Sequence, residues 1–249
     1  MKHDRKAVIF DLYGTLVDLQ VNEDTPLFWS ALASDFLVPE RCVSGEVLRG
    51  AFTHLIQQAS EHTGEGFMLN SVFSGLLEEL GLLPTFDNIS LFAGKFRKHS
   101  ITHLSKKNYT DDLLSAIRNS GYKLGLVSNT EALLTAYDLK LLSLEDRFDA
   151  IVLSSSVGIK KPDKRIFETI LGRLGVGPRE CAFVGDTFED DIVGAINAGI
   201  DPVFLTASRR FTPERGTEPE ERIVCTGFDL KEIIGALCAI GFAISSPVV

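Results

Sequence analysis

The sequence predicts an α/β protein built on a doubly wound parallel sheet, with an inserted all-α subdomain. Three observations lead to this fold class. A short apolar run at residues 7–10 ends in Asp11 and a Gly-Thr turn, which is typical of a buried strand. Residues 18–109 then repeat apolar side chains at helical spacing. After residue 109, short apolar runs alternate with segments of helical length, as in a parallel sheet covered by helices.

The expected elements follow from these patterns. Residues 1–17 and 110–249 are expected to form the core, and residues 18–109 a helical subdomain of about four helices punctuated by Pro and Gly. Strands are predicted at 7–10, 123–127, 150–153, 181–184 and 202–205, with an edge strand at 223–225. Helices are predicted at 111–120, about 131–142, after residue 163 and at 192–198. Residues 208–221 are expected to form a charged surface loop.

The amino-acid composition argues against some classes of binding partner. The formal net charge of the 249 residues is −9 and no stretch is rich in Lys or Arg, which argues against a nucleic-acid partner. No segment resembles a signal peptide, and the apolar run at 233–244 is too short to cross a bilayer. The four cysteines lack paired or metal-ligand spacing. We therefore expect a cytoplasmic protein with reduced thiols and no membrane partner.

Polar residues follow the predicted strands at four places: Asp11, Ser128, Lys161 and Asp186. The carboxyl ends of parallel strands lie on one edge of the sheet, so these residues are expected to converge on one cleft. Carboxylates, a hydroxyl and a lysine suit a phosphoryl group bound with Mg²⁺, which prefers oxygen ligands. Structural alternatives stay open, because an Asp can form the turn and a Ser can cap the next helix.

The ordered motifs resemble the haloacid dehalogenase superfamily, whose members are aspartate-nucleophile hydrolases with a Rossmann-like core. The resemblance covers nearly the whole chain, and the helical subdomain takes the place of a cap inserted after the first motif. The four matching motifs are Asp11-Leu12-Tyr13-Gly14-Thr15, Ser128-Asn129, Lys161-Pro162-Asp163, and Gly185-Asp186 through Asp190-Asp191.

The resemblance implies roles for the motif residues. Asp11 would be the nucleophile and would form an aspartyl-phosphate. Lys161 would neutralise both Asp11 and the phosphoryl group. Thr15, Ser128 and the Asn129 amide would bind the substrate.

The resemblance also implies a Mg²⁺ cofactor. Its ligands would come from Asp11, the backbone carbonyl of Tyr13, Asp186 and Asp191. Asp191 or Asp190 would orient Lys161 or hold a metal-bound water, and the resemblance leaves open which of the two serves the metal site. A purely structural role at a helix N-terminus also remains open for Asp190.

Tyr13 departs from the pattern of the family's phosphatases, which usually carry an aspartate there as the general acid and base. Such a group is worth roughly 10²–10⁴ in rate. Tyrosine resembles the haloacid dehalogenases proper, whose halide leaving group needs no proton. Two features oppose that reading. Asp186 retains a metal carboxylate, and the helical subdomain lacks the dehalogenase-type cluster of arginine and aromatic residues, since Arg41 and Arg49 stand in no matching context.

The sequence thus favours a Mg²⁺-dependent hydrolase that acts on a small phosphate ester, as a monomer or homodimer. Tyr13 would take a catalytic part as a phenol proton donor, although a reference pKa of about 10 makes it a poor base. One alternative is a 2-haloacid dehalogenase. Another is a catalytically weakened protein that keeps the fold and binds a ligand.

Overall fold

The computed structural model describes residues 4–35, 43–63, 69–201, 203–205, 223–225 and 230–244. The loop predicted at 208–221 and the side chain of Arg41 lie outside these residues. The chain divides into two compact units. The sheet unit comprises Met1–Asp18, Ser105–Thr130 and Leu142–Val249. The helical unit comprises Leu19–Leu104 and Glu131–Leu141.

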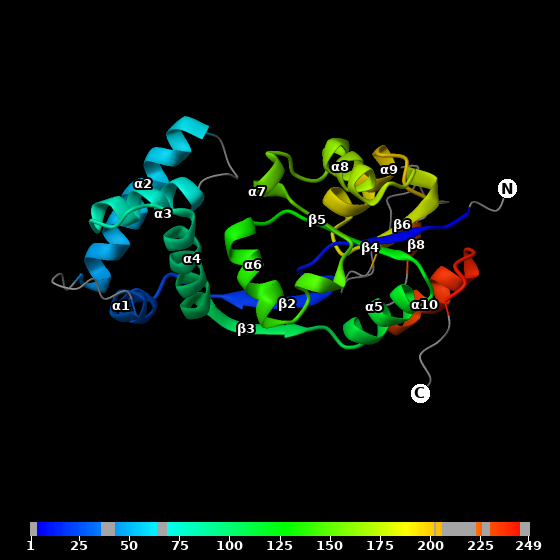
Figure 1. Ribbon diagram of the computed structural model, residues 1–249, viewed down its shortest axis with the longest axis horizontal. Coiled ribbons are helices and arrows are strands. Elements are labelled where there is room, and N and C mark those ends of the chain that lie inside the picture. The colour runs from blue at the N-terminus through cyan, green and yellow to red at the C-terminus, as the bar shows by residue number, and fades with distance from the viewer. Residues whose placement is uncertain are drawn as a thin grey trace. The chain divides into compact units, whose positions relative to one another are not determined.

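Within the described residues, the sheet unit has a six-stranded sheet in the order β5-β4-β1-β6-β7-β8 (Figure 1). All neighbouring strands are parallel. The predicted doubly wound sheet is therefore confirmed, including its last strand at the edge. The strands are β1 (Ala7–Phe10), β4 (Lys123–Ser128), β5 (Ala150–Leu153), β6 (Cys181–Gly185), β7 (Val203–Leu205) and β8 (Ile223–Cys225).

Helices cover both faces of this sheet, which explains why β1 is apolar at every position. The helical segments of the unit are α5 (Thr110–Asn119), η1 (Glu145–Arg147), α7 (Ser154–Val157), α8 (Lys164–Leu174), η2 (Pro178–Glu180), η3 (Phe188–Val193), α9 (Gly194–Asn197) and α10 (Leu230–Ala239). Figure 1 shows α8 and α9 on one side of the sheet and α5 and α10 on the other. Ala7 and Ile9 face a cluster that includes Phe167 and Ile170 of α8, whereas the alternation along the strand turns Val8 and Phe10 to the opposite face.

Two local features fix the start of helices around the third and fourth motifs. The Asp163 carboxylate caps α8 by accepting a hydrogen bond from the Arg165 amide (3.0 Å), and the hydrogen bonds from Arg165 lower its pKa to about 2. The helix predicted at 192–198 instead begins earlier, as a π-helical turn (η3) that passes into α9. A Cβ on Gly194 would lie 2.6 Å from the Phe167 ring, so glycine permits this close packing.

The helical unit packs around an aromatic core. Trp29, Phe52 and Phe96 contact one another, with ring centroids 5.1–6.1 Å apart. Its helices are α1 (Pro26–Asp35), α2 (Gly45–Thr63), α3 (Leu69–Glu79), α4 (Phe86–Ser100) and α6 (Ala132–Leu141). None of the described helices of the protein combines the length and apolarity needed to cross a membrane.

The structure differs from the sequence analysis in two ways here. The segments that lead into and out of the insertion are strands, β2 (Val17–Val21) and β3 (Ile101–Lys106), which form a two-stranded sheet. The Thr102 hydroxyl supports it by donating to the Gln20 carbonyl (3.1 Å). In addition, α6 belongs to the helical unit although it lies between core strands in the sequence, because Leu134 packs into the helical core.

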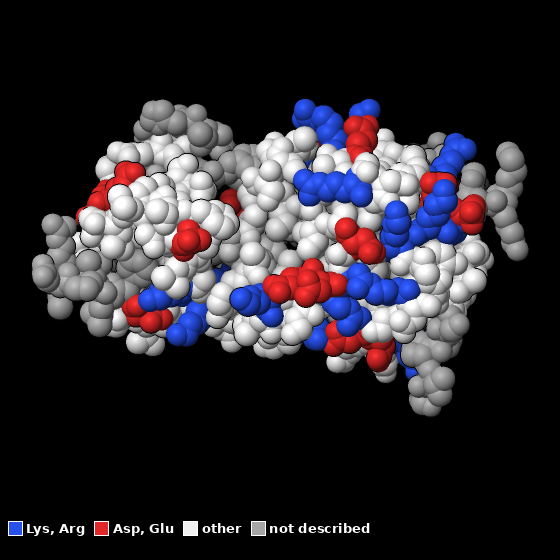
Figure 2. Space-filling model, viewed as in Figure 1, with Lys and Arg blue, Asp and Glu red and all other residues white. Residues whose placement is uncertain are grey.

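A buried ion pair also holds α6 within the helical unit. Arg97 of α4 and Asp138 of α6 are 5% and 1% exposed. The Arg97 Nε donates to both carboxylate oxygens (3.0 and 2.9 Å), and a terminal nitrogen donates at 2.6 Å. Such bidentate geometry satisfies both charges away from water. On the face shown in Figure 2, by contrast, charged side chains of both signs are interspersed.

We expect Asp138→Ala to lower the free energy of unfolding by about 3–5 kcal/mol, because it removes the carboxylate that accepts the hydrogen bonds of the buried Arg97 guanidinium. The double variant Arg97→Met with Asp138→Leu should lose less, since neither charge of this pair remains. Urea unfolding measures both. Glu168→Ala is the control, because its partner Lys164 is 60% exposed. A loss in Asp138→Ala no larger than in this control would contradict the assignment.

Candidate active site

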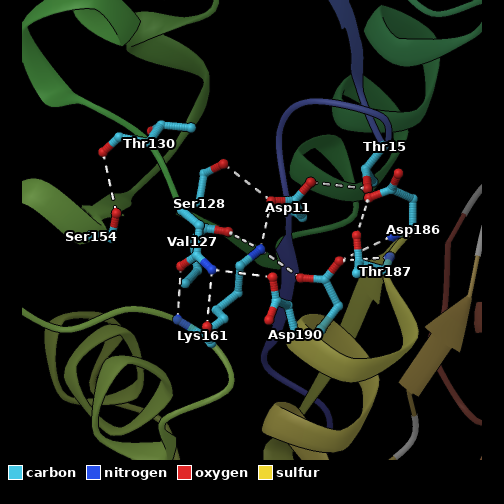
Figure 3. Close-up of polar contacts among 12 residues, drawn as sticks. Asp11, Thr15, Val127, Ser128, Thr130, Ser154, Lys161, Asp186, Thr187 and Asp190 are labelled. Atoms are coloured by element: carbon cyan, nitrogen blue, oxygen red, sulfur yellow. Dashed lines mark hydrogen bonds and ion pairs between the residues drawn. The ribbon is translucent and has the colours of Figure 1, made fainter. Parts of the chain in front are cut away.

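The sheet order brings the first, second and fourth motifs together. β1 lies between β4 and β6. Asp11 and Asp186 directly follow β1 and β6, and Ser128 is the last residue of β4, so the three side chains lie at the same edge of the sheet. Ligands of open α/β sheets bind at such carboxyl ends. Figure 3 shows these side chains together with Lys161, which reaches them from the loop before α8. The convergence expected from the sequence is therefore observed.

Both oxygens of the Asp11 carboxylate accept hydrogen bonds. Oδ1 accepts from the Ser128 hydroxyl (3.1 Å) and from Lys161 Nζ (2.6 Å). Oδ2 accepts from the Thr15 hydroxyl (3.2 Å). Asp11 is 4% exposed and Thr15 is fully buried. The carboxylate is thus held in one orientation at the sheet edge, and Thr15 contacts it directly.

Lys161 supplies a positive charge inside this site. It is 3% exposed, and its ammonium donates to Asp11, to Asp191 Oδ1 (2.5 Å) and to the Val127 carbonyl (3.3 Å). Burial alone lowers its pKa, but attraction to the two carboxylates outweighs burial, and the pKa is raised. Lys161 therefore stays charged at neutral pH.

Asp191 has both oxygens engaged by the protein. Oδ1 accepts from Lys161, and Oδ2 accepts from the backbone amides of Asp186 (3.1 Å) and Thr187 (3.0 Å). Burial, reinforced by the negative charge of Asp11 and opposed by Lys161, raises its pKa to about 6. These contacts suit a residue that orients Lys161 and the turn after β6.

Asp186 faces Asp11 across a small space. Burial raises the pKa of the Asp186 carboxyl, and the negative charge of Asp11 raises it further. One oxygen from each of Asp11, Asp186 and Asp191 lies within 4.8 Å of the others. Three carboxylates so close, with one lysine among them, leave an excess of negative charge that a divalent cation would neutralise. The donor set therefore fits Mg²⁺, which prefers such hard oxygen ligands.

The remaining predicted residues lie near this cluster. Tyr13 is half-buried, and its backbone forms a bridge with Val17. Asp190 is half-buried and accepts from Asn129 Nδ2 (3.4 Å). The Asn129 side chain also contacts the backbone of Lys161.

Sequence reasoning missed three parts of the site. It did not anticipate the Val127 carbonyl as an acceptor for Lys161, because any residue supplies a carbonyl. It did not anticipate the side-chain contacts of Asn129, because the second motif suggested only its amide. It also missed the need for Gly14, whose φ is +88° and whose Cβ would lie 2.1 Å from Asp186 Oδ2. The Gly-Thr turn was the available signal for that close approach.

The fold and site together define a class of hydrolase in which a buried aspartate follows the central strand of a Rossmann-like sheet. The haloacid dehalogenase-like hydrolase family matches residues 5–199 of this chain. The chain belongs to that family, as its motifs predicted.

Individual relatives agree with this assignment. A pyrimidine 5′-nucleotidase of Escherichia coli (strain K12) is 42% identical over 103 residues, which are 41% of this chain and 45% of that protein. The chain thus matches less than half of that relative's length. A glyceraldehyde 3-phosphate phosphatase of Pyrococcus furiosus is 27% identical over 209 residues, 80% of each chain. A solved 2-haloacid dehalogenase from Pseudomonas syringae shares the fold, with a TM-score of 0.63, 22% identity and coverage of 94% and 99%.

Proposed function

We propose that the protein is a Mg²⁺-dependent phosphatase that hydrolyses small phosphate monoesters through an aspartyl-phosphate on Asp11. The observation that carries the proposal is the buried group of Asp11, Lys161 and Asp186, in which two carboxylates and an ammonium face one space. Relatives named as a nucleotidase and a sugar-phosphate phosphatase support it. Both names describe monoester substrates, and we propose that class rather than either compound.

Asp11 and Asp186 are the proposed metal ligands, together with the Tyr13 carbonyl. Asp191 is the weaker candidate, because its oxygens already accept hydrogen bonds from Lys161 and from two backbone amides. When bound, Mg²⁺ would reduce the repulsion between the Asp11 carboxylate and an anionic phosphoryl group.

The chain's own residues account for the rest of the reaction. A carboxylate oxygen of Asp11 attacks phosphorus, an oxygen–phosphorus bond forms, and the ester oxygen leaves with its electron pair. Water then cleaves the aspartyl-phosphate and restores the carboxylate. Lys161 stabilises negative charge in both steps. The Ser128 hydroxyl, which donates to Asp11 Oδ1 in the structure, would turn to donate to a phosphoryl oxygen of the bound substrate. Thr15 keeps Asp11 oriented through its bond to Oδ2.

We expect the purified protein to release phosphate from an aryl phosphate in the presence of Mg²⁺ but not of EDTA. Asp11→Asn should abolish turnover, because an amide is no nucleophile towards phosphorus. A colorimetric phosphate assay measures both results. Asp112→Asn, an exposed change of the same type on α5, is the control and should retain full activity. Phosphate release that survives Asp11→Asn or EDTA would disprove the proposal.

The dependence on Asp186 is tested by Gly14→Ala, which places a methyl group where the Asp186 carboxylate lies. Gly158→Ala is the matched control, because Gly158 has a similar φ of +71° with nothing within 4 Å of the added Cβ. Both changes strain the backbone, but only Gly14→Ala should displace Asp186. We expect Mg²⁺ to raise the melting temperature of the wild type and of Gly158→Ala, and to raise that of Gly14→Ala much less. Equal shifts in both variants would argue against a metal at Asp186.

A 2-haloacid dehalogenase is the second candidate, and Tyr13 is the observation that favours it. A halide needs no proton as it leaves, so Tyr13 costs such an enzyme little. An alkoxide leaving group does need a proton. A phenol can donate one, but its reference pKa of about 10 makes it a poor base for activating the water of the second step, whereas an aspartate can serve in both steps.

Tyr13→Asp should therefore increase turnover of an alkyl phosphate, by up to about 10²-fold, with a smaller gain for an aryl phosphate whose leaving group is already good. Parallel assays measure phosphate release and chloride release from 2-chloropropionate. Chloride release without Mg²⁺, together with no gain in phosphate release, would favour the dehalogenase.

A further inference from the structure

The Asn129 side chain occupies an unusual place between two motifs. Its Oδ1 accepts from the backbone N–H of Lys161 (2.7 Å), and its Nδ2 donates to the carbonyl of the same residue (3.0 Å). Nδ2 also lies 3.4 Å from Asp190 Oδ2. A reversed amide would set oxygen against two acceptors, so the three contacts agree on one orientation.

Lys161 needs such an anchor because it lies in the loop between α7 and α8 rather than in a strand. Its flexible side chain must place one nitrogen 2.6 Å from Asp11, 2.5 Å from Asp191 and 3.3 Å from the Val127 carbonyl. Fixing the backbone of Lys161 restricts where the ammonium can lie, and charged groups in active sites depend on such support.

We propose that Asn129 is a positioning residue, whose side-chain amide ties the end of β4 to the backbone of Lys161 and so fixes the ammonium against Asp11. This inference rests on the proposed function for its effect on turnover, but the tie itself does not. It is separate from the role implied by the family motif, in which the amide of Asn129 contacts substrate, because it concerns the side chain, whose contacts are with the protein.

That distinction makes the side chain testable by itself, because Asn129→Ala keeps the backbone N–H and removes only the tie. We expect the amide hydrogen of Lys161 to exchange with solvent several-fold faster in Asn129→Ala than in the wild type. Hydrogen–deuterium exchange, read by mass spectrometry on peptides that contain residue 161, measures this without any activity assay. Asn119→Ala, at the exposed end of α5, is the control and should leave that exchange unchanged.

The effect on catalysis should fall on kcat more than on KM. Misplacing a catalytic group by about 1 Å costs up to about 10²-fold in rate, so we expect kcat of Asn129→Ala for an aryl phosphate to fall by about that factor. Asn129→Asp serves as a second variant of the same shape, in case the alanine variant does not fold. It keeps the acceptor for the Lys161 N–H and loses the donor, so the amide should stay protected while kcat falls.

Unchanged exchange at Lys161 in Asn129→Ala would overturn the tie, and wild-type kcat in both variants would overturn the positioning role. Absence of phosphatase activity in the wild type is a different result, because it would refute the proposed function. In that case the exchange experiment still decides the tie, with faster exchange supporting it and unchanged exchange rejecting it.

Discussion

The site depends on one buried ammonium that lies between two buried carboxylates. Without Lys161, Asp11 and Asp191 would face each other as like charges in a region of low dielectric. Without both carboxylates, the buried lysine would lose its proton or draw water into the sheet edge. The three groups therefore stabilise one another only as a set. This mutual requirement explains why residues from three motifs, far apart in the sequence, must be brought within hydrogen-bonding distance.

The parallel sheet meets that requirement and leaves the side chains of the site little conformational freedom. Adjacent strands deliver Asp11, Ser128 and Asp186 to one edge, and backbone groups complete the arrangement. The Val127 carbonyl and the amides after β6 hold Lys161 and Asp191 in fixed positions. Such a rigid set suits phosphoryl transfer, in which positioning and charge matter more than covalent machinery.

Much of this architecture could be predicted from local patterns. Short apolar runs mark strands because both faces of a covered sheet are buried, and polar residues after them mark the ligand edge. The contacts of Asn129 could not be predicted, because its side chain hydrogen-bonds the backbone of a residue that is distant in the sequence. Such a contact produces no periodic pattern of residue types. The alternation from Val17 to Val21 did carry a strand signal, but the helical periodicity around it dominated. α6 packs in the helical unit because Leu134 contacts the core of that unit. The apolar face of a helix does not indicate, from the sequence alone, which unit the helix will pack against.

The membership of α6 means that the chain passes between the two units four times, at 18–19, 104–105, 130–131 and 141–142. An insertion with only two crossings is a module that recombination can exchange as a single cassette. Here an exchange of residues 19–104 would leave out α6, which belongs to the same unit. The protein that receives the segment would need a matching helix between two of its own core strands. Divergence of this subdomain should therefore proceed by compensated point changes on both sides of β4 rather than by wholesale exchange.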